Sequence, residues 1–230
     1  MQGCVAALLL WLSASSSASA SGPDGLYLMT RFMGGMLEMK AWYFEADTFA
    51  LEPRAASKPF DFDEAERVAP GSTGRLERKG DRWTFHWKNG PSRPGRHEPG
   101  SGPGGCFYWD AGLFCPVQAF RPGQVLDGAY TGSLGSSRVG SSRTYVFTPD
   151  GRYRMSSSAS VVSTGPTVSM YGGATNRQEG RYRLQGHLIV LSPDQGPEVT
   201  FSAFPFEPTA DASKPGRVYV GGFMLKRTGP

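Results

Sequence analysis

The chain has 230 residues, with 24 lysines and arginines against 20 aspartates and glutamates and a formal net charge of +4. Acidic and basic residues are interspersed, so the clustered basic patches of nucleic-acid-binding proteins are absent. The 31 glycines and 18 prolines, together with the lack of long helical periodicity, predict an all-β protein with many turns.

Residues 1–20 predict a cleaved signal peptide. Residues 5–12 form an apolar run, and Ala18-Ser19-Ala20 has the small-residue pattern of a signal-peptidase site, although no basic residue precedes the run. An N-terminal membrane anchor is the alternative, but the run is short for crossing a bilayer. We therefore expect an exported protein, periplasmic or extracellular, whose mature chain begins at residue 21.

Residues 21–120 and 121–230 share a pattern that predicts two tandem β repeats. Gly25 and Tyr27 match Gly128 and Tyr130, 103 positions later. The remaining matches include Trp42 with Tyr145, Phe44 with Phe147 and, after a slip of three residues, Gly74 with Gly180, Leu76 with Tyr182, Gly80 with Gly186, Phe85 with Leu191, and Gly90 with Gly196; residues 110–114 match 220–224 more loosely. Convergence of similar hairpins within one large sheet is the alternative.

Local patterns place strands, turns and one helix. Alternation in residues 82–87, "RWTFHW", predicts a strand with its aromatic residues on one face, and residues 149–151, "PDG", predict a turn between two strands. Residues 60–69 predict the short helix of the first repeat, capped by Asp61 or Asp63. Residues 88–105 are rich in glycine and proline and predict a long loop.

The clearest strands span five to seven residues, and their outward positions carry arginine and lysine. A membrane-spanning barrel needs longer strands with an outward apolar band, so we do not expect the chain to span a membrane.

Cys106 and Cys115 predict a disulfide. If Asp110-Ala111 is a two-residue hairpin turn, Cys106 faces Cys115 at a non-hydrogen-bonded position, where the Cα atoms approach within disulfide range. An oxidising compartment favours the bond. A three-residue turn shifts the register and separates the pair.

The second half carries the motifs G-x-Y, aromatic-x-F-x-x-D-G, G-x-Y-x-L-x-G and V-Y-x-G-G, and the first half carries them in degraded form. This pattern resembles uncharacterised secreted bacterial proteins with tandem lipocalin-like β-barrel repeats. The resemblance implies antiparallel meander strands, an envelope location and no catalytic residue. Whether the repeats form one barrel, two barrels or a closed sandwich stays open, because meanders hide their edges in each of these ways.

Inward-facing aromatic residues are the candidate ligand site. An apolar pocket for a lipid or another hydrophobic small molecule is one interpretation, and an ordinary packed core is the other. The candidate residues are Trp42, Trp83, Phe85, Trp87, Tyr130, Tyr145 and Tyr182.

Four arginines share an outward parity on strands that we expect to be neighbours. They are Arg152, Arg154, Arg181 and Arg183. Guanidinium groups bind phosphate and carboxylate through paired hydrogen bonds, so this surface is a candidate for anionic lipid head groups. A solvated, partly ion-paired face is the alternative.

No enzyme signature emerges from the remaining residues. His86, His97 and His187 lack metal-ligand spacing and are expected to be solvated, and the serine clusters lack a nucleophile-elbow motif. We therefore expect no metal and no cofactor. The leading hypothesis is an exported, non-enzymatic binding protein of the cell envelope; a structural or protein-interaction module with a filled core is second, and a hydrolase of unrecognised type is third.

Overall fold

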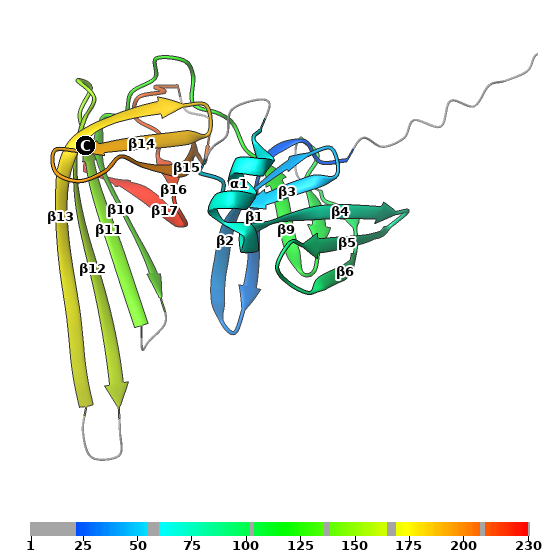
Figure 1. The fold of residues 1–230 in the computed structure, drawn as a ribbon. Helices are drawn as coiled ribbons and strands as arrows, with labels where there is room; N and C mark the ends of the chain where they lie inside the picture. The colour runs from blue at the N-terminus through cyan, green and yellow to red at the C-terminus, as the bar shows by residue number, and fades with distance from the viewer. Residues whose placement is uncertain are drawn as a thin grey trace, which may run out of the picture.

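The computed structural model describes residues 22–54, 60–101, 104–135, 139–164, 169–207 and 210–229. The predicted signal peptide lies outside the described residues. The described chain forms two antiparallel sheets, one after the other in sequence, and each curls into a barrel (Figure 1). The all-β fold is therefore confirmed, and the repeats form two barrels side by side rather than one merged barrel.

None of the helices in the described ranges has the length and apolarity needed to cross a bilayer.

The first sheet has nine strands in the order β6-β5-β4-β3-β2-β1-β9-β8-β7. The strands are β1 (Gly25–Met33), β2 (Met36–Glu45), β3 (Thr48–Leu51), β4 (Thr73–Lys79), β5 (Arg82–Trp87), β6 (Ser92–Arg96), β7 (Glu98–Pro99), β8 (Phe107–Trp109) and β9 (Gly112–Pro116). The sheet is nearly closed, because β6 lies close to β8: a Cβ atom on Gly95 would come within 2.5 Å of the Trp109 Nε1 atom.

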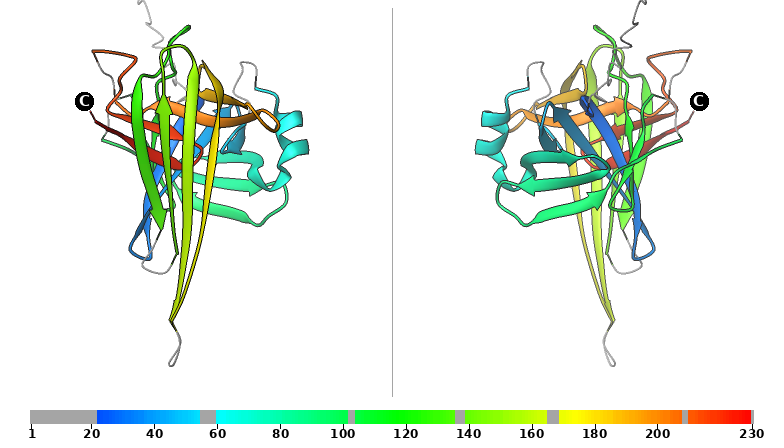
Figure 2. Two further views of the ribbon diagram at one scale, coloured as in Figure 1. Left: turned by 90° about the vertical axis from the view of Figure 1, so that its left-hand side faces the viewer. Right: turned by 90° about the vertical axis from the view of Figure 1, so that its right-hand side faces the viewer.

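The second sheet is a closed barrel of eight strands, in which β10 pairs with both β11 and β17. The strands are β10 (Gly128–Gly135), β11 (Val139–Phe147), β12 (Arg152–Thr164), β13 (Ser169–Gln185), β14 (Leu188–Pro193), β15 (Val199–Pro205), β16 (Arg217–Val220) and β17 (Phe223–Thr228). The hairpins β12–β13 and β1–β2 extend in the same direction, and β12–β13 reaches beyond both barrels (Figures 1 and 2).

Strand order is shared by the two barrels, as a tandem repeat predicts. In each, a run of consecutive antiparallel strands ends with a last hairpin whose final strand pairs with the first strand. Gly74 and Gly180, which match in the sequence, have the same role: an added Cβ atom would lie 2.2 Å from the His86 carbonyl oxygen and 2.3 Å from the Ser192 carbonyl oxygen, respectively. At these matching positions on β4 and β13, each barrel therefore requires a residue without a side chain.

Two expectations from the sequence are wrong. The predicted loop 88–105 contains β6 and β7, and β6 pairs with β5. Pro94 is tolerated there because β6 ends the sheet, and proline is restricted to such edge strands. The strands are also longer than predicted, since β12 has 13 residues and β13 has 17. Their serine- and glycine-rich outer parts lack the apolar alternation that marks a strand in sequence.

The helix was correctly predicted. Helix α1 (Phe62–Val68) begins after Asp61, whose side chain accepts a hydrogen bond from the Glu64 backbone N–H at 2.8 Å. This contact satisfies one of the free donors at the helix start. A 3-10 turn, η1 (Pro70–Ser72), connects the helix to β4.

Each barrel has its own apolar core, and a third apolar cluster joins the two barrels. It combines outward-facing residues of β1–β3, such as Leu28 and Tyr43, with Phe204 of β15 and Tyr219 of β16. The rings of Phe204 and Tyr219 stack with centroids 4.7 Å apart. Because these residues are buried together, the two barrels pack against each other through one continuous apolar interface.

Polar contacts complete the junction. The Tyr219 hydroxyl donates a hydrogen bond to the Glu52 Oε1 atom, which also accepts from the Ala41 backbone N–H at 2.9 Å. The Ser202 hydroxyl donates to the Pro53 carbonyl oxygen at 2.7 Å. Burial raises the pKa of Glu52, although the hydrogen bonds from Tyr219 and Ala41 act in the opposite direction. Ionising Glu52 is therefore less favourable in the folded protein than in water.

Candidate functional site

A cavity of about 320 Å³ lies at one end of the first barrel. Three tryptophans form much of its wall: Trp42 on β2, Trp87 at the end of β5 and Trp109 at the end of β8. Met29, Leu51 and Phe114 complete the apolar lining. We call this space the tryptophan cavity; its volume is near the lower limit for small-molecule sites.

Strand alternation and the pairing of the strands bring the three indoles to one cavity. Trp42 and Trp87 face inward with Phe44 and Phe85, and their ring centroids are 5.4 Å apart. Trp109 occupies space beside Gly95 and directly opposite Gly112, which has no side chain to fill the barrel at that level. Gly95 therefore leaves room for the Trp109 indole, and Gly112 lines the cavity without a side chain of its own.

Trp42 has an unsatisfied donor. Its side chain is buried, with 5% of its surface exposed. Its Nε1–H finds no hydrogen-bond acceptor among the described residues. Trp109, by comparison, donates to the Trp83 carbonyl oxygen at 3.4 Å. A buried donor without an acceptor costs free energy, so an acceptor that reached this nitrogen would stabilise the protein.

Charged side chains surround the open end of the cavity. The Arg31 Nε atom lies 2.5 Å from the Glu38 carboxylate, and its Nη1 atom lies 3.6 Å from the Asp110 carboxylate. Lys40 reaches Glu38 only at 4.0 Å, and no ion pair joins Arg93 to a carboxylate of the described residues. Three cations against two carboxylates leave this end with a formal charge of +1.

The first-barrel residues predicted as ligand contacts divide into three positions. Trp42 and Trp87 line the tryptophan cavity. Phe85 is fully buried in the barrel core, with its ring centroid 4.2 Å from that of Trp109. Trp83 lies beyond Phe85, in a hollow at the opposite end of the barrel, where its ring stacks on His97 at 3.9 Å.

The stacking of His97 on Trp83 differs from the solvated histidine that the sequence suggested. Burial lowers the pKa of His97, because the charged imidazolium is less well hydrated there. The described residues contain no group of three or more His, Cys, Asp or Glu side chains arranged to hold a metal ion.

The predicted tyrosines belong to the packed core of the second barrel. Tyr130, Tyr145 and Tyr182 are buried there together with Phe147. The Tyr182 hydroxyl accepts a hydrogen bond from the Leu126 backbone N–H at 2.7 Å and donates to the Leu126 carbonyl oxygen at 2.9 Å. This hydroxyl therefore fixes the segment that precedes β10. Burial also raises its pKa to about 12.

The four arginines of the predicted anion-binding surface share one face of the β12–β13 pair. Arg152 lies directly opposite Arg181, and Arg154 lies opposite Glu179. Two members are already paired: Arg152 contacts Asp194 at 2.9 Å, and Arg183 forms two hydrogen bonds with Glu198, at 2.8 and 2.9 Å. These carboxylates neutralise half of the cluster, which favours the ion-paired face over an anion site.

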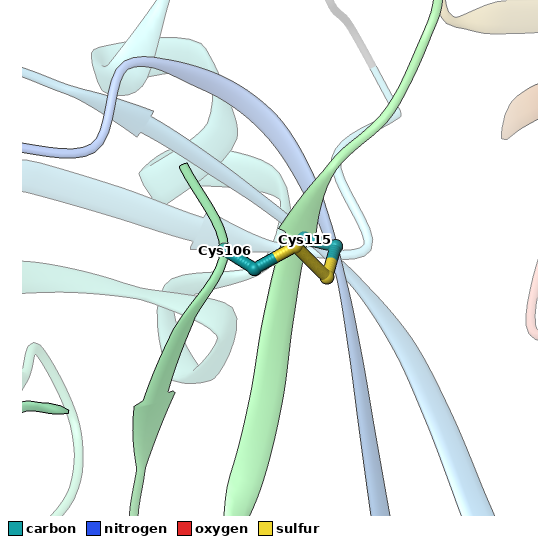
Figure 3. The surroundings of a disulfide bond; sticks show 2 residues. All are labelled: Cys106 and Cys115. Carbon is teal, nitrogen blue, oxygen red and sulfur yellow. A yellow bond between two sulfur atoms is a disulfide. The ribbon is translucent and has the colours of Figure 1, made fainter. Parts of the chain in front are cut away.

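The predicted disulfide is present, and Figure 3 shows Cys106 and Cys115 joined across the β8–β9 hairpin, with their Cα atoms 4.2 Å apart. The turn is the predicted one, since Asp110 and Ala111 both adopt positive φ, at 48° and 58°. Cys106 and Cys115 lie at the end of the hairpin away from Asp110, whereas Asp110 lines the tryptophan cavity.

Sequence reasoning missed Trp109 as a cavity residue. It lies opposite Gly112 in the β8–β9 hairpin, and the pairing of β9 with β1 brings this hairpin to the cavity that Trp42 and Trp87 also line. The inward parity of "FYW" at 107–109 was the available signal.

The tip of the β1–β2 hairpin is another feature that was not predicted. Phe32 is 77% exposed, and Met33, Met36 and Leu37 are also exposed. Exposed apolar side chains that adjoin one another often mark contact surfaces.

Comparison of the chain with protein-family models, curated proteins and solved structures returned no match.

Proposed function

We propose that the protein is an exported, non-enzymatic binding protein of the cell envelope that holds a small hydrophobic molecule in the tryptophan cavity. The observation that carries the proposal is the tryptophan cavity itself, whose walls are three indoles together with Met29, Leu51 and Phe114. The unsatisfied Nε1–H of Trp42, one of its lining residues, is a buried donor that a ligand could pair. Concave, largely apolar sites with a few polar anchors are typical of small-molecule binding. The disulfide is compatible with the oxidising compartment that export implies.

Native mass spectrometry of the mature protein, purified without detergent from an exporting host, tests this proposal. We expect a discrete adduct that organic extraction removes and identifies as a hydrophobic molecule. Leu51→Trp adds a ring to the cavity wall and should abolish the adduct while leaving the circular dichroism spectrum unchanged. An adduct that persists in this variant places the ligand elsewhere.

A protein-interaction module is the second candidate, and the exposed β1–β2 tip favours it. A photo-crosslinking residue at position 32 should then yield one defined cross-linked partner in the exporting host. The same residue at position 108, an exposed site on β8, is the control. Equal labelling from both positions would contradict a specific interface at the tip.

A further inference from the structure

The walls and the mouth of the tryptophan cavity differ in chemistry, and together they narrow the class of ligand. We infer that the cavity selects small apolar molecules that carry one anionic acceptor, such as a carboxylate. The inference rests on the proposed function, because it specifies the ligand of the same site.

The first step concerns the acceptor. Trp42 lines the cavity, and its Nε1–H is buried without an acceptor among the described residues. Because this nitrogen has almost no accessible surface, a ligand oxygen reaches it once the neighbouring side chains shift. A purely hydrocarbon ligand would leave the donor unsatisfied, whereas an anionic oxygen would form a charge-assisted bond with it.

The second step concerns the position of the charge. Lys40 precedes Trp42 by two residues on β2, so both side chains face the same side of the strand. Two residues along a strand correspond to about 6.6 Å, a distance that a lysine side chain can span. A single carboxylate next to the Trp42 indole is therefore within reach of the Lys40 ammonium group.

The third step excludes a cationic ligand. Tryptophan faces attract cations, and a cage of three indoles could suit a quaternary ammonium group. However, both carboxylates at the mouth, Glu38 and Asp110, are engaged by Arg31. Lys40 and Arg93 then leave the mouth with an excess of positive charge, which repels a cation and attracts an anion.

The body of the ligand is limited by the cavity walls. Trp87 and Trp109 provide flat apolar surfaces, and Phe114 lies against Trp42 with ring centroids 5.5 Å apart. With about 320 Å³ available, the site suits one short alkyl chain or a small aromatic ring system rather than a phospholipid.

Three probes with the same alkyl chain test the inference: octanoate, octan-1-ol and octyltrimethylammonium. Isothermal titration calorimetry of the intact mature protein at low ionic strength should give an octanoate affinity at least about tenfold above that of octan-1-ol, because a hydrogen bond to a charged group is the stronger one. Octyltrimethylammonium should bind most weakly.

Two variants identify the groups responsible. Trp42→Phe keeps an aromatic ring but removes the donor. Lys40→Gln removes the charge, and the Lys40 side chain is 41% exposed, so it contributes little to packing. Each should weaken octanoate binding about tenfold and reduce its advantage over octan-1-ol. Trp83→Phe is the matched control, because Trp83 lies at the opposite end of the barrel. Thermal unfolding of each variant checks that the fold is retained.

The outcomes separate the two proposals. If octanoate and octan-1-ol bind with equal affinity and Leu51→Trp blocks the binding of both, the preference for an anion is overturned but the binding function is retained. Tightest binding of octyltrimethylammonium would overturn it in favour of a cation cage. No binding of any probe, with no adduct in native mass spectrometry, would overturn both.

Discussion

Breaking the disulfide should destabilise the protein measurably, even though the bond closes only a short loop. Cys106 and Cys115 are nine positions apart in sequence. In the chain-entropy model, cross-linking residues at this separation removes about 2.5–3 kcal/mol of conformational freedom from the unfolded chain. Total stabilities are about 5–15 kcal/mol, so the loss is a substantial fraction. For a chain of this length, it corresponds to a decrease of about 5–12 °C in the melting temperature.

The assay is urea unfolding followed by circular dichroism, with oxidised wild type, reduced wild type and the Cys106→Ser/Cys115→Ser variant. Reduced wild type and the variant should lose similar unfolding free energy, and adding reductant to the variant should change nothing further. The reasoning is refuted if the unfolding free energies of reduced wild type and of the variant both stay within about 0.5 kcal/mol of that of oxidised wild type. In that case the β8–β9 hairpin must already be closed in the unfolded ensemble.

Three further predictions concern the barrel cores and their junction. Phe85→Ala should lower the unfolding free energy by about 3–5 kcal/mol in urea titrations, since the ring is fully buried among other aromatic side chains. Tyr182→Phe should cost about 1–3 kcal/mol in the same assay, because it leaves the buried Leu126 N–H and C=O groups unpaired. Glu52→Gln keeps an oxygen that can accept the hydrogen bonds from Tyr219 and Ala41. Because the pKa of Glu52 is raised in the folded protein, the wild type should lose unfolding free energy as the pH rises from about 4 through that pKa. The glutamine variant has no ionisable group at this position and should lose none from it. Unfolding free energies that change with pH in parallel for both proteins would contradict this assignment.

Several features of the fold were predictable because they depend on neighbouring residues in sequence. The alternation in residues 82–87 places Trp83 and Phe85 inside, and Asp61 caps the helix that follows it. The Asp110-Ala111 turn determines which residues face each other, and this register brings the two cysteines together. Local geometry is sufficient for such features, since turn type and side-chain period determine the register of a hairpin.

The candidate site was predicted only in part, because it depends on strands that are distant in sequence. Trp42 and Trp87 were identified as inward-facing residues, but parity cannot distinguish Phe85, which fills the core, from its neighbours that line a cavity. The lining is complete only once β9 pairs with β1, which places Phe114 opposite Met29, and once β6 approaches β8, where Gly95 leaves room for the Trp109 indole.

The β class, the tandem pattern and the disulfide can be predicted from local sequence, because strand alternation, turn residues and hairpin register are set over a few residues. The distinction between aromatic residues of the core and those that line a cavity depends on the folded chain, as do the ion pairs of Arg31 with Glu38 and Asp110 and of Arg183 with Glu198. These properties arise from long-range strand pairing, which brings together side chains whose separation in sequence carries no information about their distance in space.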